Sequence, residues 1–225
     1  MASAGIHGVT CQAATVTAMR LCGGSFPVED PEALLSDYLN RSYGYAWPAY
    51  DTLVTNGSAE LVSGDLLAPS LLEAHIDGPR FRVLLDMIPA LAPVGSLPPR
   101  ALGEATDEDI AAVADLFAVL DSDRYRHRGV RGTIVSKVLH RKRPDLVPLY
   151  DSRIDAAYRA SGQLPNDPRR TWRDFMTLLC RLMRADLVGH GETFAALQKQ
   201  AADKGADLTP LRILDILVWM SLEDA

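Results

Sequence analysis

Apolar residues recur at helical spacing over most of the chain, and this pattern predicts a succession of helices. We expect helices at about residues 30–41, 65–76, 79–88, 106–120, 133–141, 152–160, 167–187, 192–204 and 209–223. Residues 1–24 cannot be assigned, and no stretch gives a firm strand signal. The predicted fold class is therefore all-α.

Several helix ends carry recognisable signals. Asp30 stands before a proline, as a capping acid does, and Thr106 with Asp109 resembles a capping box. Thr209 is the expected cap of the last helix, which is apolar nearly all round and so predicts a buried strut. Pro89 is expected to kink or end the helix in which it occurs.

The same pattern divides the 225 residues into four parts. We expect an acidic N-terminal helical lobe at 1–92, a linker rich in Pro and Gly at 93–105, and a hairpin-containing helical lobe at 106–187. Residues 188–225 should form C-terminal helices that pack back on the body. The aromatic residues of 42–50 suit either the stacking of bases or a loop packed on the core.

The net charge is −6, but the charges are unevenly distributed. Residues 1–123 carry 5 basic and 17 acidic side chains, whereas residues 124–184 carry 15 basic and 5 acidic ones. Between Arg124 and Arg143 there are eight Lys or Arg and no acid. An acidic body with one basic flank can still present a phosphate-binding face, because salt screens distant exposed charges. The alternative is that these cations pair with the acidic first half at an internal interface.

The basic stretch also has a distinct order of elements. A turn between Gly129 and Gly132 opens a short amphipathic helix, which Pro144 and Pro148 end by imposing an extended passage. Asp151 then stands where the next helix begins.

This order resembles the helix-hairpin-helix DNA glycosylase superfamily. Gly129-Val130-x-Gly132 is similar to the family's hairpin, and Val147-Pro148-x-x-Asp151 is similar to its segment with the catalytic aspartate. The stretch is also similar to bacterial proteins of unassigned function. The resemblance implies a two-lobed helical fold, double-stranded DNA as a partner, and excision of a base that is flipped into the cleft between the lobes.

Two departures from the family's pattern bear on mechanism. The hairpin of the family usually reads Gly-x-Gly, whereas here it reads Gly-x-x-Gly. Members that also cleave the strand carry a lysine just after the hairpin, where this chain has Thr133. Lys137 lies one turn further on and is expected to point elsewhere. The resemblance therefore implies a monofunctional N-glycosylase, a hydrolase without a Schiff-base step.

Asp151 is the candidate catalytic residue. Base excision passes through an oxocarbenium-like sugar, and a nearby carboxylate can stabilise that charge or activate a water. The alternative is structural, because an aspartate before a helix is a preferred N-cap. Glycines let the backbone approach a phosphate, and cations around the turn add contacts. The predicted nucleic-acid contacts are Gly129, Gly132, Thr133, Lys137, His140, Arg141 and Arg143.

Other classes of site have little support in the sequence. The three cysteines are odd in number and lack metal spacing, which is typical of reduced thiols in a cytoplasmic protein. The five histidines do not fall at ligand spacing, so we expect no metal and no cofactor. The sequence contains no run of 18 apolar residues and therefore predicts no membrane span.

Two rival functions remain open. The first is a non-catalytic module that binds nucleic acid or a nucleotide on the same scaffold. The second is an enzyme that acts on a small nucleoside or a specialised metabolite, which the acidic net charge would suit.

Overall fold

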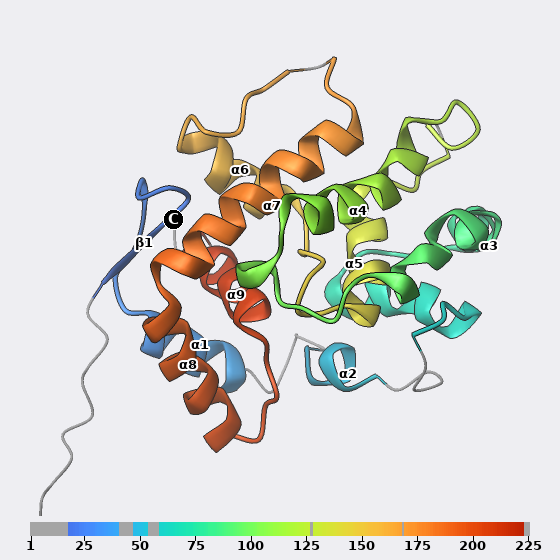
Figure 1. Ribbon diagram of the computed structural model, residues 1–225. Helices are drawn as coiled ribbons and strands as arrows, with labels where there is room; N and C mark the ends of the chain where they lie inside the picture. The colour runs from blue at the N-terminus through green and yellow to red at the C-terminus, as the bar shows by residue number, and fades with distance from the viewer. Residues whose placement is uncertain (1–17, 41–46, 54–58, 127, 168, 223–225) are drawn as a thin grey trace, which may run out of the picture.

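The computed structural model describes residues 18–40, 47–53, 59–126, 128–167 and 169–222, and is predominantly helical (Figure 1). The all-α class is confirmed. The α-helices are α1 (Pro31–Asn40), α2 (Trp47–Thr52), α3 (Gly78–Leu91), α4 (Asp107–Phe117), α5 (Gly132–Lys142), α6 (Ser152–Ala160), α7 (Trp172–Gly189), α8 (Gly191–Asp203) and α9 (Pro210–Ser221). The 3-10 helices are η1 (Ser63–Leu72), η2 (Ala92–Ser96), η3 (Leu102–Glu104) and η4 (Ala118–Asp121), and the strands are β1 (Met19–Leu21) and β2 (Phe26–Val28).

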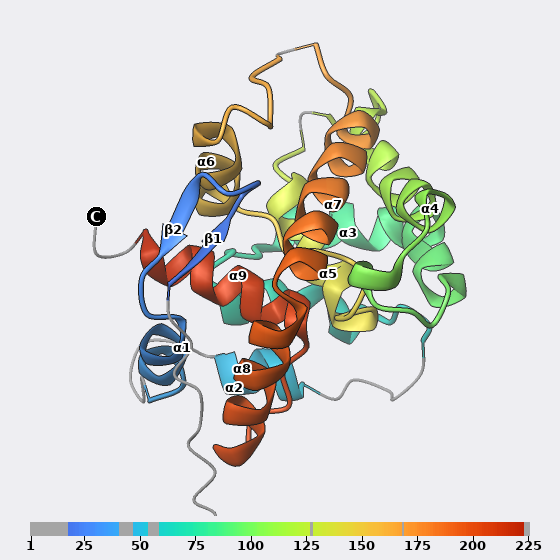
Figure 2. The same cartoon turned by 60° about the vertical axis from the view of Figure 1, so that its left-hand side comes forward.

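Helix α9 lies at the centre of the molecule, as Figure 2 shows. It contacts α1, α6, α7 and α8, and every residue from Leu211 to Val218 is buried. The prediction of a buried strut is confirmed. The helix is enclosed because its apolar residues cover nearly the whole circumference, so no face of it favours water.

The other helices also contact one another. Helix α4 lies along α7, and α5 packs against η1. A single hydrophobic cluster contains residues from both sides of the segment 93–105, and Leu97 and Leu102 of that segment belong to it. The Leu102 N–H donates to the Asp145 carbonyl at 2.8 Å, so this segment is packed onto the body. The division into lobes stays a prediction.

The capping signals have the expected local effect. Thr106 accepts from the Asp109 N–H at 3.2 Å while the Asp109 carboxylate accepts from the Thr106 N–H at 2.8 Å, so the capping box heads α4. The Thr209 hydroxyl accepts from the Arg212 N–H and caps α9. Helix α7 begins later than predicted, because Thr171 accepts from the Asp174 N–H and starts the helix there.

Two segments that contain a proline differ from the predictions. The segment expected as an α-helix at 65–76 is the 3-10 helix η1, with Pro69 inside it and Glu73 after it in the left-handed region at φ 60°. Pro89 does not end α3, which continues to Leu91, and the alternative of a kink at Pro89 stays a prediction. Because Pro89 stands in the last turn, its missing N–H removes only one backbone hydrogen bond, close to the end of the helix.

A short β-hairpin was missed by the sequence pattern. Strands β1 and β2 pair antiparallel, with Met19 opposite Val28. Each strand has only three residues, which is too short for alternation to be recognised. The Asp186 carboxylate of α7 accepts from the N–H of Cys22 at 2.9 Å and holds the turn of the hairpin on the body.

Candidate active site

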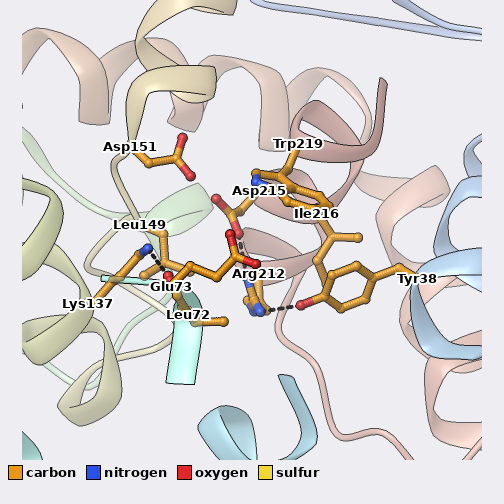
Figure 3. Close-up of a pocket in the computed structure, with 10 residues that line it drawn as sticks. All are labelled: Tyr38, Leu72, Glu73, Lys137, Leu149, Asp151, Arg212, Asp215, Ile216 and Trp219. Atoms are coloured by element: carbon orange, nitrogen blue, oxygen red, sulfur yellow. Dashed lines mark hydrogen bonds and ion pairs between the residues drawn. The ribbon is translucent and has the colours of Figure 1, made fainter. Parts of the chain in front are cut away.

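A pocket lies where the end of η1, helix α5, the passage before α6 and helices α1 and α9 meet (Figure 3). The space between its lining residues, with the open solvent at its mouth included, is about 450 Å³. Charged groups converge on it from segments that are distant in the sequence. Its lining residues are Tyr38, Leu72, Glu73, Lys137, Leu149, Asp151, Arg212, Asp215, Ile216 and Trp219.

Asp151 both caps a helix and lines this pocket. Its Oδ1 accepts from the N–H groups of Arg153 at 2.9 Å and Ile154 at 3.0 Å, which satisfies two of the first N–H groups of α6. Figure 3 shows the carboxylate at the edge of the hollow, turned toward Asp215. The structural and functional interpretations of Asp151 are thus compatible, because capping fixes the carboxylate while leaving it at the cavity.

Lys137 reaches the same pocket, so the expectation that it points elsewhere is wrong. Helix α5 is buried on nearly all sides from Ile134 to His140, and its lysine therefore enters the interior. The Nζ donates to the Leu72 carbonyl at 2.5 Å. Burial lowers the pKa of Lys137, although the carboxylates of Asp151 and Asp215 act in the opposite direction.

Arg212 and Asp215 form the inner wall of the pocket from α9. The Arg212 guanidinium is 4% exposed, donates to the Tyr38 hydroxyl at 2.7 Å and bonds to the carboxylate of Asp215. Its Nε lies 3.2 Å from the Asp51 Oδ1, so one guanidinium serves two carboxylates. Burial raises the pKa of Asp215 to about 6, and Arg212 partly offsets this effect.

Glu73 supplies a third carboxylate, at the exposed side of the pocket. Its backbone lies in the left-handed region, which is uncommon for a residue that is not glycine. In Figure 3 its side chain extends past the Leu72 carbonyl toward Asp215. The pocket therefore combines three carboxylates with one amine and one guanidinium.

Three of the predicted phosphate contacts are engaged inside the protein. His140 is buried, with Nδ1 2.7 Å from the Val147 carbonyl, and burial lowers its pKa to about 3. Arg141 donates to the backbone carbonyl of Asp51 at 3.2 Å and also to that of Leu53. Arg143 donates to the backbone carbonyls of the segment 97–98. The contacts of Arg141 and Arg143 join the basic stretch to the first half of the chain, as the alternative of an internal interface implies, but through backbone carbonyls and not through acids.

The glycine turn is separate from the pocket lining. Gly129 has a positive φ of 77°, which explains the glycine, and Gly132 packs so tightly on Trp172 that a Cβ would come within 2.2 Å of its ring. Thr133 is half-buried, and its carbonyl accepts from the Ser136 hydroxyl at 3.1 Å. The lining residues named above include Asp151 but none of the predicted phosphate contacts Gly129, Gly132 and Thr133.

The sequence interpretation missed most of the pocket. Tyr38, Glu73 and Trp219 carried no signal that separates them from ordinary residues. Arg212 and Asp215 did carry one, because charged residues three apart interrupt a helix that is otherwise apolar. Charged side chains are buried only when other groups pair with them or accept their hydrogen bonds, so this pair is a signal of a functional site.

Two further observations concern the described part of the chain. None of its helices has the length and apolar character needed to cross a membrane. Within the same residues, no group of three or more His, Cys, Asp or Glu is arranged to hold a metal ion.

Comparison with known proteins places the chain in a family. The model of a family described as a family of unknown function, DUF6308, matches residues 31–222. The chain belongs to the DUF6308 family. No curated protein and no solved structure matches it. The matched range includes all the residues that line the pocket, so the DUF6308 region contains the complete candidate site.

Proposed function

We propose that this protein cleaves an N-glycosidic bond in the pocket, by the DNA glycosylase-like chemistry that the sequence resemblance implies. The observation that carries the proposal is that the Asp151 carboxylate, fixed by two backbone N–H groups, lines a pocket together with the Lys137 amine. A carboxylate held beside the anomeric carbon stabilises an oxocarbenium-like sugar as the base departs.

We propose that water, and not the Lys137 amine, is the nucleophile, so that the reaction is monofunctional. The Lys137 amine already donates to the Leu72 carbonyl, so it must leave that partner before it can attack the sugar. Burial lowers its pKa, so the uncharged amine, which is the nucleophilic form, forms more readily than in a solvated lysine. Treatment with borohydride separates the two routes: a covalent adduct that disappears in Lys137→Met would show amine attack, and a reaction without an adduct supports attack by water.

The test of the function uses duplex oligonucleotides that each carry one modified base: uracil, hypoxanthine, 7-methylguanine or 8-oxoguanine. We expect the wild-type protein to leave an alkali-labile abasic site in at least one of them. Asp151→Asn should lower that rate by at least ~10²-fold, because the neutral amide cannot stabilise the cationic sugar. The asparagine oxygen can still accept from the two N–H groups, so the fold should persist.

The matched control is Asp203→Asn, at an exposed aspartate on α8. It should retain the wild-type rate. If Asp151→Asn retains that rate as well, Asp151 is not catalytic and the proposal is wrong.

A free nucleoside is a second candidate substrate, and a specific observation favours it. Arg141 and Arg143, expected to contact phosphates, bind backbone carbonyls, and Glu73 places an acid at the exposed side of the pocket. Chromatography of the free base released from nucleosides, in parallel with the duplexes, distinguishes the two substrates. Binding of DNA without release of base would instead indicate a non-catalytic module.

The exposed arginines of the turn give an independent test of DNA as the partner. Arg128 and Arg131 are exposed beside Gly129 and Gly132. If they contact phosphates, replacing either by alanine should reduce the slope of log affinity against log salt by about one. An unchanged slope in both variants removes the turn from any DNA interface.

A further inference from the structure

Two carboxylates of different environment face the same pocket. Asp151 is half-exposed at the start of α6 and is held by backbone N–H groups. Asp215 is 6% exposed on the central helix α9. Its partner Arg212 also pairs with the Asp51 carboxylate. Paired acids in unlike environments are suited to opposite tasks, one as an anion and the other as a proton donor.

The surroundings of Asp215 favour a carboxyl group that keeps its proton. Its position is buried, and the charge of Arg212 is divided between Asp215 and Asp51. The carboxylate of Asp151 opposes the ionisation of Asp215, whereas Arg212 and Lys137 favour it. The charged groups that line the pocket with Asp215 are Arg212 on α9, Asp151 before α6, Lys137 on α5 and Glu73 after η1. Arg212 in turn contacts Tyr38 on α1 and Asp51 on α2.

The side chain of Asp215 is directed into the pocket. In Figure 3 the Asp215 carboxyl points from α9 into the space bordered by Asp151 and Glu73. Its Oδ2 is bonded to Arg212, so the other oxygen is the one that can carry a proton toward the cavity. A base seated between α9 and the α6 N-terminus would meet Asp151 at its sugar and Asp215 at its ring.

We infer that Asp215 is the general acid of this pocket, which protonates the departing base while Asp151 faces the sugar. The inference rests on the proposed function. The bond between the anomeric carbon and the base nitrogen breaks, its electron pair stays with the base, and the proton of Asp215 is added to the base. Water then adds its oxygen to the anomeric carbon, and the proton that this water loses restores the carboxyl of Asp215.

The experiment compares two departing groups. Hypoxanthine in a duplex needs a proton to leave, whereas 7-methylguanine is already cationic and leaves neutral without one. Asp215→Asn should slow the release of hypoxanthine by ~10²-fold or more and change the release of 7-methylguanine only a few-fold. Asp151→Asn should slow both. Equal loss on both substrates in Asp215→Asn would overturn the role of proton donor.

The pH profile gives a second readout that a structural role would not change. Wild-type release of hypoxanthine should fall as the pH rises above about 6, the pKa to which burial raises Asp215, and Asp215→Asn should lack that decline. Carbon-13 NMR of labelled aspartate carboxyls measures the same group without activity: the resonance missing from Asp215→Asn should titrate near this value. Titration of that resonance near the ordinary 3.8 would overturn the inference in an active or inactive protein.

The outcomes separate this inference from the function on which it rests. A wild-type protein that releases no base from any of the four duplexes or from free nucleosides overturns both together. An active wild type whose decline with pH survives in Asp215→Asn overturns only the role of Asp215. Thermal unfolding of each variant verifies that the asparagine side chain, which can still accept from Arg212, leaves the fold intact.

Discussion

Removal of the Lys142 ammonium should destabilise the protein strongly, because this cation of the basic stretch forms an ion pair inside the protein. Its Nζ lies 2.8 Å from the Asp65 Oδ2, and the two side chains are 6% and 3% exposed. Asp65 also accepts from the Val62 N–H at 2.8 Å at the start of η1. The ion pair thus joins α5, which carries Lys137, to the 3-10 helix that ends beside the pocket.

The magnitude follows from what the substitution leaves behind. Lys142→Met keeps a chain of similar length but removes the ammonium that pairs with the buried Asp65 carboxylate, which costs about 3–5 kcal/mol. For a chain of this size, each kcal/mol lowers the melting temperature by about 2–4 °C, so a fall of roughly 6–20 °C is expected. Unfolding in urea, followed by circular dichroism, measures the free energy directly.

Two further variants make the measurement decisive. Lys199→Met removes an exposed lysine on α8 and should change the free energy of unfolding by less than ~0.5 kcal/mol. Adding Asp65→Asn to Lys142→Met should recover part of the loss, because the charge left buried is then removed. A loss below about 1 kcal/mol in Lys142→Met would refute the reasoning and show that this lysine is not confined to the interior.

Two other perturbations test the stability of the fold. Because burial raises the pKa of Asp215 from 3.8 to about 6, the native state binds this proton more tightly than the unfolded chain, and the free energy of unfolding should fall as the pH rises from about 4 to 6, by roughly 3 kcal/mol. Urea titrations at each pH should show this step in the wild type and not in Asp215→Asn. Gly132→Ala should cost about 1–3 kcal/mol because its Cβ would overlap the Trp172 ring, whereas Gly78→Ala, with open space around it, should be neutral or stabilising. Equal melting temperatures for the two alanine variants would show that the contact with Trp172 is not rigid.

The sequence by itself determined the helical class, most helix positions and several of the caps. These features depend on interactions within a few residues, such as those of Thr106 with Asp109 and of Asp151 with the next N–H groups. The burial of α9 was also set locally, because a helix without a polar face has no side that favours water.

Only the tertiary structure decided the content of the pocket and the role of the basic stretch. The Lys137 amine meets a carbonyl 65 residues away, and Arg212 meets a tyrosine 174 residues away. Local pattern identifies a cation but cannot state whether water, a phosphate or an internal carbonyl surrounds it, because that depends on which segments pack together. The same cations that predicted an external phosphate face therefore became, in part, the internal bonds that hold the first half of the chain onto α5.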